Sequence, residues 1–97
     1  MAQYIVLLNW TDQGIRNVKE SPKRLDAGRA AAKKLGIELK DAYMTMGDVD
    51  MVIHAEAPND ESLAKFILTL GGAGNVRTRT LKAFSEDEYR KILGSLG

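Results

Sequence analysis

The order in which strand-like and helix-like segments follow one another restricts the fold of this chain more than any other feature. Residues 3–9, 37–46, 50–57 and 75–83 are rich in β-branched and aromatic side chains or alternate apolar with polar residues, as strands do. Residues 22–35 and 60–71 place apolar or small side chains every three or four positions, as helices do. The order βαββαβ predicts an α+β, ferredoxin-like fold, with a four-stranded antiparallel sheet and two helices on one face.

Local signals indicate where the helices begin and end. Ser21-Pro22 is typical of a helix start, with serine as the N-cap and proline at the first helical position. Gly36 can end that helix in the left-handed conformation, and Asn59 can cap the next one. Ser85 and Glu88 form a capping box, which predicts a third helix over residues 86–95.

Length and composition exclude several classes of protein. At 97 residues we expect one domain, residues 1–97, without the disulfides or thiolate metal sites that cysteines would provide. The net charge of +1, and the lack of aromatic side chains in "VDMVIHAEA", argue against a nucleic-acid partner. No apolar run approaches the ~20 residues of a membrane span, and the N-terminus does not resemble a signal peptide. We expect a cytoplasmic protein.

The first strand is apolar on both of its faces. Ile5 and Leu7 point to one side, and Tyr4, Val6 and Leu8 point to the other. The two helices cover only one face of the sheet, so the second face also needs cover. The short last helix can supply part of it and a second subunit more, so we expect a homodimer, or an oligomer of dimers, joined through the face opposite the helices. Val6 or Leu8 would then be at the interface.

The stretch "YMTMGDVDMVIHAEAP" places two carboxylates and the single histidine close together in sequence. A calcium loop needs more oxygen ligands at set spacing, and no such run follows Asp48 and Asp50. Gly47 and Asp48 are residues typical of a tight reversal between two strands. We therefore predict a structural turn and no metal site, and nothing in the sequence indicates a bound cofactor.

Several stretches together resemble the GYD domain family: "YIVLLNWTDQG", "SPKR", "MTMGDVD", "EAP" and "GNVRTRTLKAFSEDEY". The resemblance implies a small bacterial or archaeal protein of the dimeric α/β-barrel group, and it covers nearly the whole chain. The naming motif matches at Gly47 and Asp50, but Val49 stands where a tyrosine is expected. The resemblance implies this architecture and dimerisation. It does not imply a reaction, because no activity is established for the family. Related barrel families include oxygenases, haem-handling enzymes and small-molecule-binding regulators, an analogy at the level of fold.

Four residues are candidates for binding a small molecule. Asn9 and Trp10 end the first strand, His54 lies within the third and Arg77 within the fourth. Asparagine and arginine can orient a polar or anionic ligand, tryptophan can form an apolar wall, and histidine can move a proton. These residues also have ordinary structural roles. His54 can be an interface residue, and Arg77, with Arg79, can be a charge on an edge strand.

Two functions stay open at this point, and the sequence does not decide whether the protein is an enzyme. The first is a homo-oligomer that binds a small molecule in or near the sheet, at Asn9, Trp10, His54 and Arg77. The alternative is a non-catalytic protein-interaction or regulatory module whose surface carries the function. A cofactor-free, oxygenase-like enzyme follows only by analogy of fold.

Overall fold

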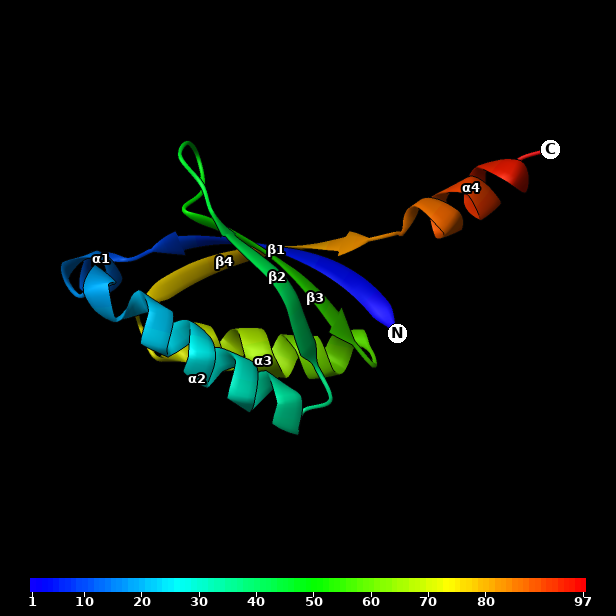
Figure 1. Cartoon of the computed structure of the whole chain (residues 1–97). Coiled ribbons are helices and arrows are strands. Elements are labelled where there is room, and N and C mark those ends of the chain that lie inside the picture. The colour runs from blue at the N-terminus through cyan, green and yellow to red at the C-terminus, as the bar shows by residue number, and fades with distance from the viewer.

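A sheet of four antiparallel strands forms one layer of the molecule, and two helices lie against one of its faces (Figure 1). The computed structural model describes residues 1–97. Strand β1 (Ala2–Trp10) is central, between β3 (Met51–Ala57) and β4 (Val76–Ala83), and β2 (Glu38–Met44) pairs with the other side of β3. The order β2-β3-β1-β4 is that of a split βαβ unit, so the predicted ferredoxin-like fold is confirmed.

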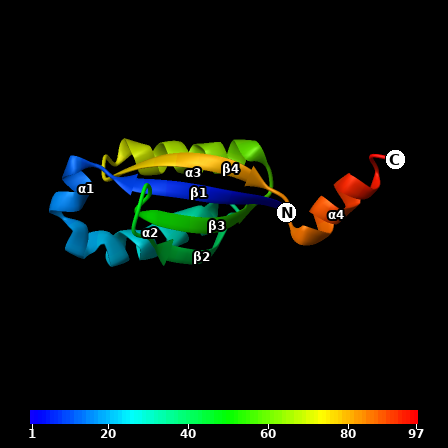
Figure 2. The same ribbon diagram turned by 90° about the horizontal axis from the view of Figure 1, so that it is seen from above.

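The two long helices, α2 (Ser21–Lys34) and α3 (Asp60–Gly72), connect the strands across one face. Figure 2 shows α3 behind β4 and β1, and α2 behind β3 and β2. The connection after β1 contains the short helix α1 (Asp12–Arg16) and a 3-10 turn (Val18–Glu20). The last helix, α4 (Glu86–Gly94), follows β4.

The caps agree with the sequence at three of four positions. Asn59 and Ser85 accept hydrogen bonds from the first turns of α3 and α4, and Gly36 has a φ of 75° after α2. The prediction of Ser21 as an N-cap is wrong, because Ser21 already lies inside the helix. The chain enters α2 directly from the 3-10 turn, and Glu20 before it already has helical dihedral angles.

The core lies between the helices and the sheet. It contains residues of β1, β3, α2 and α3, together with Leu39 of the edge strand β2 and Ile37 just before it. All are at most 9% exposed: Tyr4, Val6, Leu8, Ala32, Ile37, Leu39, Ile53, Ala55, Ala57, Leu63 and Phe66. Val6 and Leu8 therefore belong to the interior of the subunit, and the expectation that one of them lies at an interface is wrong. Ile5 and Leu7 occupy the opposite face, which no helix covers.

We call that uncovered side the open face. Register places Ile5 beside His54 and Leu81, and Leu7 beside Val52 and Arg79. Ile5, Leu7 and Val52 are half-buried and Leu81 is 52% exposed, so an apolar strip crosses the centre of the face. Its apolar side chains have no cover within the subunit.

Helix α4 does not supply that cover. It projects beyond the end of the sheet, away from α2 and α3 (Figures 1 and 2). It has no substantial packing contact with another element. Its apolar side chains Tyr89, Ile92 and Leu93, and Leu96 just after it, are 44–75% exposed. The expectation that the last helix covers part of the sheet is thus not met within one subunit.

The chain is extended for its size. Its radius of gyration is 14.6 Å, whereas a compact domain of this length has about 12.5 Å. Its accessible surface is 6686 Å², whereas a compact monomer of 10.7 kDa exposes about 5,500 Å². The excess, about 1,200 Å², comes with the projecting helix and the open face. None of the helices combines the length and the apolar character needed to cross a membrane.

Candidate functional site

The four predicted ligand residues lie on two sides of the sheet. Asn9 and Arg77 are paired across β1 and β4 on the open face. His54 is on the same face but pairs with Ile5, four positions along β1 from Asn9 and so about 13 Å away along the strand. Trp10 points to the helix side, because adjacent residues of a strand face opposite ways. The structure brings Asn9 and Arg77 together, and a ligand role for the four stays a prediction.

His54 has protein partners on the open face. Its Nε2 lies 2.6 Å from Oε1 of Gln3, and since an amide oxygen accepts, His54 donates this hydrogen bond. Its Nδ1 lies 4.0 Å from a carboxylate oxygen of Asp41, an ion pair if the imidazole is protonated. The side chain is 34% exposed. These contacts hold the imidazole between β1 and β2, and they do not involve Asn9 or Arg77.

The loop between β2 and β3 is a hydrogen-bonded turn, as its sequence predicts. Gly47 has a φ of 138°, and Thr45 donates from its backbone N–H to the carbonyl of Asp50 at 2.8 Å. The carboxylate of Asp50 accepts from the backbone N–H of Trp10 at 2.9 Å, and Asn9 donates to the carbonyl of Asp48 at 3.1 Å. The loop carboxylate therefore ties the turn to the end of β1.

Because only one of the two loop carboxylates accepts a backbone hydrogen bond, replacing Asp50 and replacing Asp48 should affect stability differently. We expect Asp50→Ala to lower the free energy of unfolding by about 1–3 kcal/mol, because it leaves the N–H of Trp10 without its acceptor. The side chain of Asp48 has no such partner, so Asp48→Ala should change stability by less than about 0.5 kcal/mol. Urea denaturation of the three proteins measures this. Equal losses in both variants would contradict the assignment.

A second polar cluster joins β1, β4 and the start of α3. The hydroxyl of Tyr4 donates to Oδ1 of Asp60, and Nζ of Lys82 lies 3.1 Å from the same oxygen and 5.9 Å from the centre of the Tyr4 ring. Burial, and then the hydrogen bond to Asp60, raise the pKa of Tyr4 to about 12. The same hydrogen bond, followed by that of Lys82, lowers the pKa of Asp60. A tyrosine that holds its proton so firmly fastens the helix start to the sheet and is poorly suited to act as a base.

The raised pKa of Tyr4 makes stability fall at alkaline pH. The unfolded tyrosine titrates near pH 10.0 and the folded one near 12, so between these values the folded chain binds the extra proton. The stabilisation is complete below pH 10 and is lost as pH rises through 12. We expect Tyr4→Phe to lower stability at neutral pH by about 1 kcal/mol and to flatten the alkaline slope.

The prediction is checked by measuring the free energy of unfolding in urea at several pH values above 8, for the unsubstituted chain, for Tyr4→Phe and for a control variant. Tyr89→Phe is the matched control, because Tyr89 is 54% exposed on α4 and has no hydrogen-bond partner for its hydroxyl. It should keep the slope of the unsubstituted chain. The same slope in Tyr4→Phe as in the control would show that Tyr4 is not responsible.

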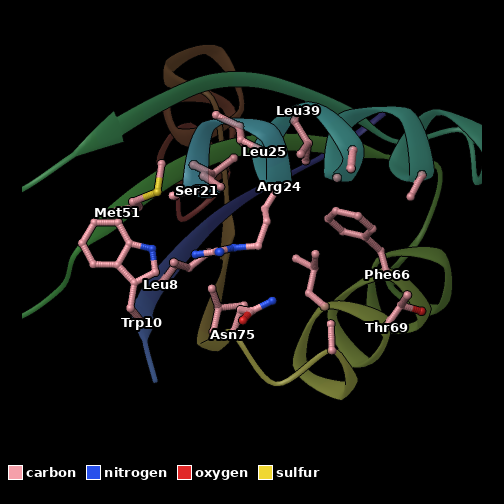
Figure 3. A pocket seen from close by; sticks show the side chains of 17 residues that line it. Leu8, Trp10, Ser21, Arg24, Leu25, Leu39, Met51, Phe66, Thr69 and Asn75 are labelled. Carbon is pink, nitrogen blue, oxygen red and sulfur yellow. The ribbon is translucent and has the colours of Figure 1, made fainter. Parts of the chain in front are cut away.

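A mostly apolar cavity lies on the helix side, between α2, α3 and the sheet (Figure 3). Its volume is about 310 Å³, and 12 of its 17 lining residues are hydrophobic. Trp10 and Phe66 are the aromatic residues of the lining, and Arg24 is its one charged residue. Asn9, His54 and Arg77 do not line it. The sequence analysis did not predict this cavity. The one indication in the sequence was the row of small side chains on α2, which can leave space beside a helix.

No three side chains of histidine, cysteine, aspartate or glutamate gather closely enough to form a metal-binding group. The polar clusters at His54 and Tyr4 are bonded to other elements of the chain. The main apolar surfaces that the subunit offers to other molecules are the open face, the apolar stripe of α4 and the cavity beneath α2.

Fold and surface together define a class: a small α+β protein of ferredoxin-like topology with one sheet face uncovered. Within that class the chain belongs to the GYD family, because the model of the GYD domain matches residues 4–93. A relative from Thermus thermophilus is 30% identical over 84 residues, which is 86% of this chain and 88% of the relative. That protein is named "Glutamine synthetase and cystathionine beta-lyase binding protein".

Three crystal structures share the fold. MtbAldR matches 88% of this chain with a TM-score of 0.69 and 17% identity, and the chain spans about half, 52%, of that protein. FFRP-DM1 matches 87% of this chain and 100% of its own, with a TM-score of 0.60 and 22% identity. A protein of Thermus thermophilus matches 88% and 95%, with a TM-score of 0.55 and 24% identity. At such identities the likeness concerns the fold alone.

Proposed function

We propose that this chain is a cytoplasmic protein-interaction module that works as a homodimer joined through the open face. The observation that carries the proposal is the apolar surface left without cover on that face and on α4. Such surface on a subunit of this size is typical of an interface. The proposed occupant of the open face is a second copy of the chain.

The area supports that choice of occupant. The chain exposes about 1,200 Å² more than a compact monomer of its mass would, and a standard interface buries about 800 Å² per partner. The excess is therefore sufficient for a dimer in which the open faces meet and α4 packs on the partner. Asn9, His54 and Arg77 would then lie in or beside the interface, where His54 and Arg77 can add polar contacts.

The relative suggests what the dimer binds in turn. A protein 30% identical over most of this chain is named for binding glutamine synthetase and cystathionine β-lyase. We propose enzymes of these two kinds, from the same organism as the chain, as its partners. Light scattering at micromolar concentration should give twice the mass of the 10.7 kDa chain.

The partner experiment uses the purified enzymes on a biosensor surface, with an unrelated oligomeric enzyme of similar charge as the control. Saturable binding to either named enzyme and not to the control is the expected result. A monomer of 10.7 kDa at micromolar concentration would contradict the dimer. Failure of both enzymes to bind would contradict the proposed partners.

A further inference from the structure

Helix α2 directs its smallest side chains toward α3, and this leaves a space that no side chain of the subunit fills. Ala27, Gly28 and Ala31 line the cavity from α2, and Phe66 and Leu70 line it from α3. A Cβ added at Gly28 would come no closer than 4.0 Å to Leu70, so the glycine is not required for close approach of the helices. The volume of about 310 Å³ falls at the lower end of the range for small-molecule sites.

The charge at this cavity belongs to Arg24. Its Nη1 donates to the carbonyl of Asn17 at 3.0 Å and its Nη2 to the carbonyl of Gly14 at 3.3 Å. None of the six ion pairs of the chain includes Arg24, so no carboxylate lies within 4.0 Å of its guanidinium. Figure 3 shows the side chain reaching from α2 toward Trp10. The half-buried positive charge is held in place but not neutralised.

We propose that this cavity binds an amphipathic carboxylate, a small molecule with an apolar body and one carboxylate group. The apolar lining accommodates the body, between Trp10 and Phe66. The guanidinium of Arg24 has N–H groups left for the carboxylate, a pairing that arginine makes in bidentate geometry. The site lies on the opposite side of the sheet from the proposed dimer interface, so it is independent of the oligomeric state.

The test uses octanoate and octan-1-ol, which share an apolar chain and differ in charge. Calorimetry and amide chemical-shift changes should show that octanoate binds at a single site and that octan-1-ol binds more weakly. Arg24→Gln should raise the Kd of octanoate at least about tenfold and that of octan-1-ol less than about twofold. Arg29→Gln, on the exposed side of α2, is the matched control and should change neither.

A second variant fills the space. Gly28→Leu should weaken both probes at least about tenfold, because its side chain occupies the cavity. Leucine also favours the helix over glycine, so the variant should fold, and thermal unfolding checks this. Leu81→Glu, on the open face, should leave the binding of both probes unchanged.

Three results would overturn the proposal. One is that octanoate shows no binding at concentrations up to about 10 mM, because a Kd above that value would be too weak for a built site. Another is that Arg24→Gln and Arg29→Gln weaken octanoate equally, which would indicate general attraction to positive charge. The third is that octanoate binds only when Ile92 of α4 and Leu96, which follows the helix, are both replaced by glutamate. That result would identify the C-terminal segment of a partner as the occupant of the cavity.

Discussion

Replacing Leu81 by glutamate is expected to raise the dissociation constant of the proposed dimer at least about 100-fold. Leu81 lies on the open face, where it is 52% exposed in the subunit, so the substitution should leave the fold of the chain intact. Burying a leucine contributes about 1.5–3 kcal/mol, and a symmetric dimer carries the substitution twice. The loss is then about 3 kcal/mol or more, which corresponds to at least about 100-fold in affinity.

The matched control for this variant is Leu68→Glu. Leu68 is 76% exposed on α3, on the other side of the molecule, and receives the same change of side chain. Light scattering across a dilution series should show Leu81→Glu as a monomer at concentrations where the control is a dimer. Circular dichroism confirms that both are folded. A dimer that dissociates in Leu68→Glu and persists in Leu81→Glu would place the interface on the helices instead of the open face.

The sequence predicts the elements of this fold because local signals agree with the global pattern. The four strands and the helices α2, α3 and α4 begin and end within two residues of the predicted bounds. The capping box at Ser85 and the positive φ of Gly36 are determined by neighbouring residues alone. Ser21 is the exception, because its role depends on how the 3-10 turn leads into α2, and a cap signature cannot show that.

The face that each β1 residue occupies could not be predicted in the same way. Both alternating sets of β1 are apolar, so hydrophobic pattern alone does not say which set meets the helices. The pairing decides the question: Val6 lies opposite Ile53, which is buried in the core. That register is a long-range property of the fold. The sequence alone does predict that Trp10 and Asn9 lie on opposite faces of the sheet, because neighbouring residues in a strand point to opposite faces.

The cavity beneath α2 arises from tertiary structure. Alanines and glycines on a helix allow it to approach a sheet closely, so the composition of α2 does not by itself indicate a cavity. The structure leaves about 310 Å³ between α2, α3 and the sheet, lined on the α2 side by Ala27, Gly28 and Ala31. The position of Arg24 at this space depends on carbonyl groups of α1 and the following turn, whose placement no local pattern specifies.

The apolar stripe of α4 is expected to be as important to the proposed dimer as the open face. Nine residues are too few for a stable isolated helix, even with the capping box at Ser85 and the ion pair between Arg90 and Glu86. The helix therefore depends on packing that its own subunit does not supply. We expect Ile92→Glu combined with Leu93→Glu to weaken the dimer at least about 100-fold, for the same reason of lost apolar burial as for Leu81.

Lys91→Glu is the control for that double variant, because Lys91 directly precedes the two substituted residues in sequence but lies on the opposite side of the helix. It should change the dissociation constant less than about threefold, the range of a surface charge. Since α4 contributes nothing to the core, the double variant should keep the strands and the two long helices, which amide hydrogen exchange can verify. If the double variant stayed as tightly dimeric as Lys91→Glu, α4 would lie outside the interface, and its stripe would be free for partner enzymes.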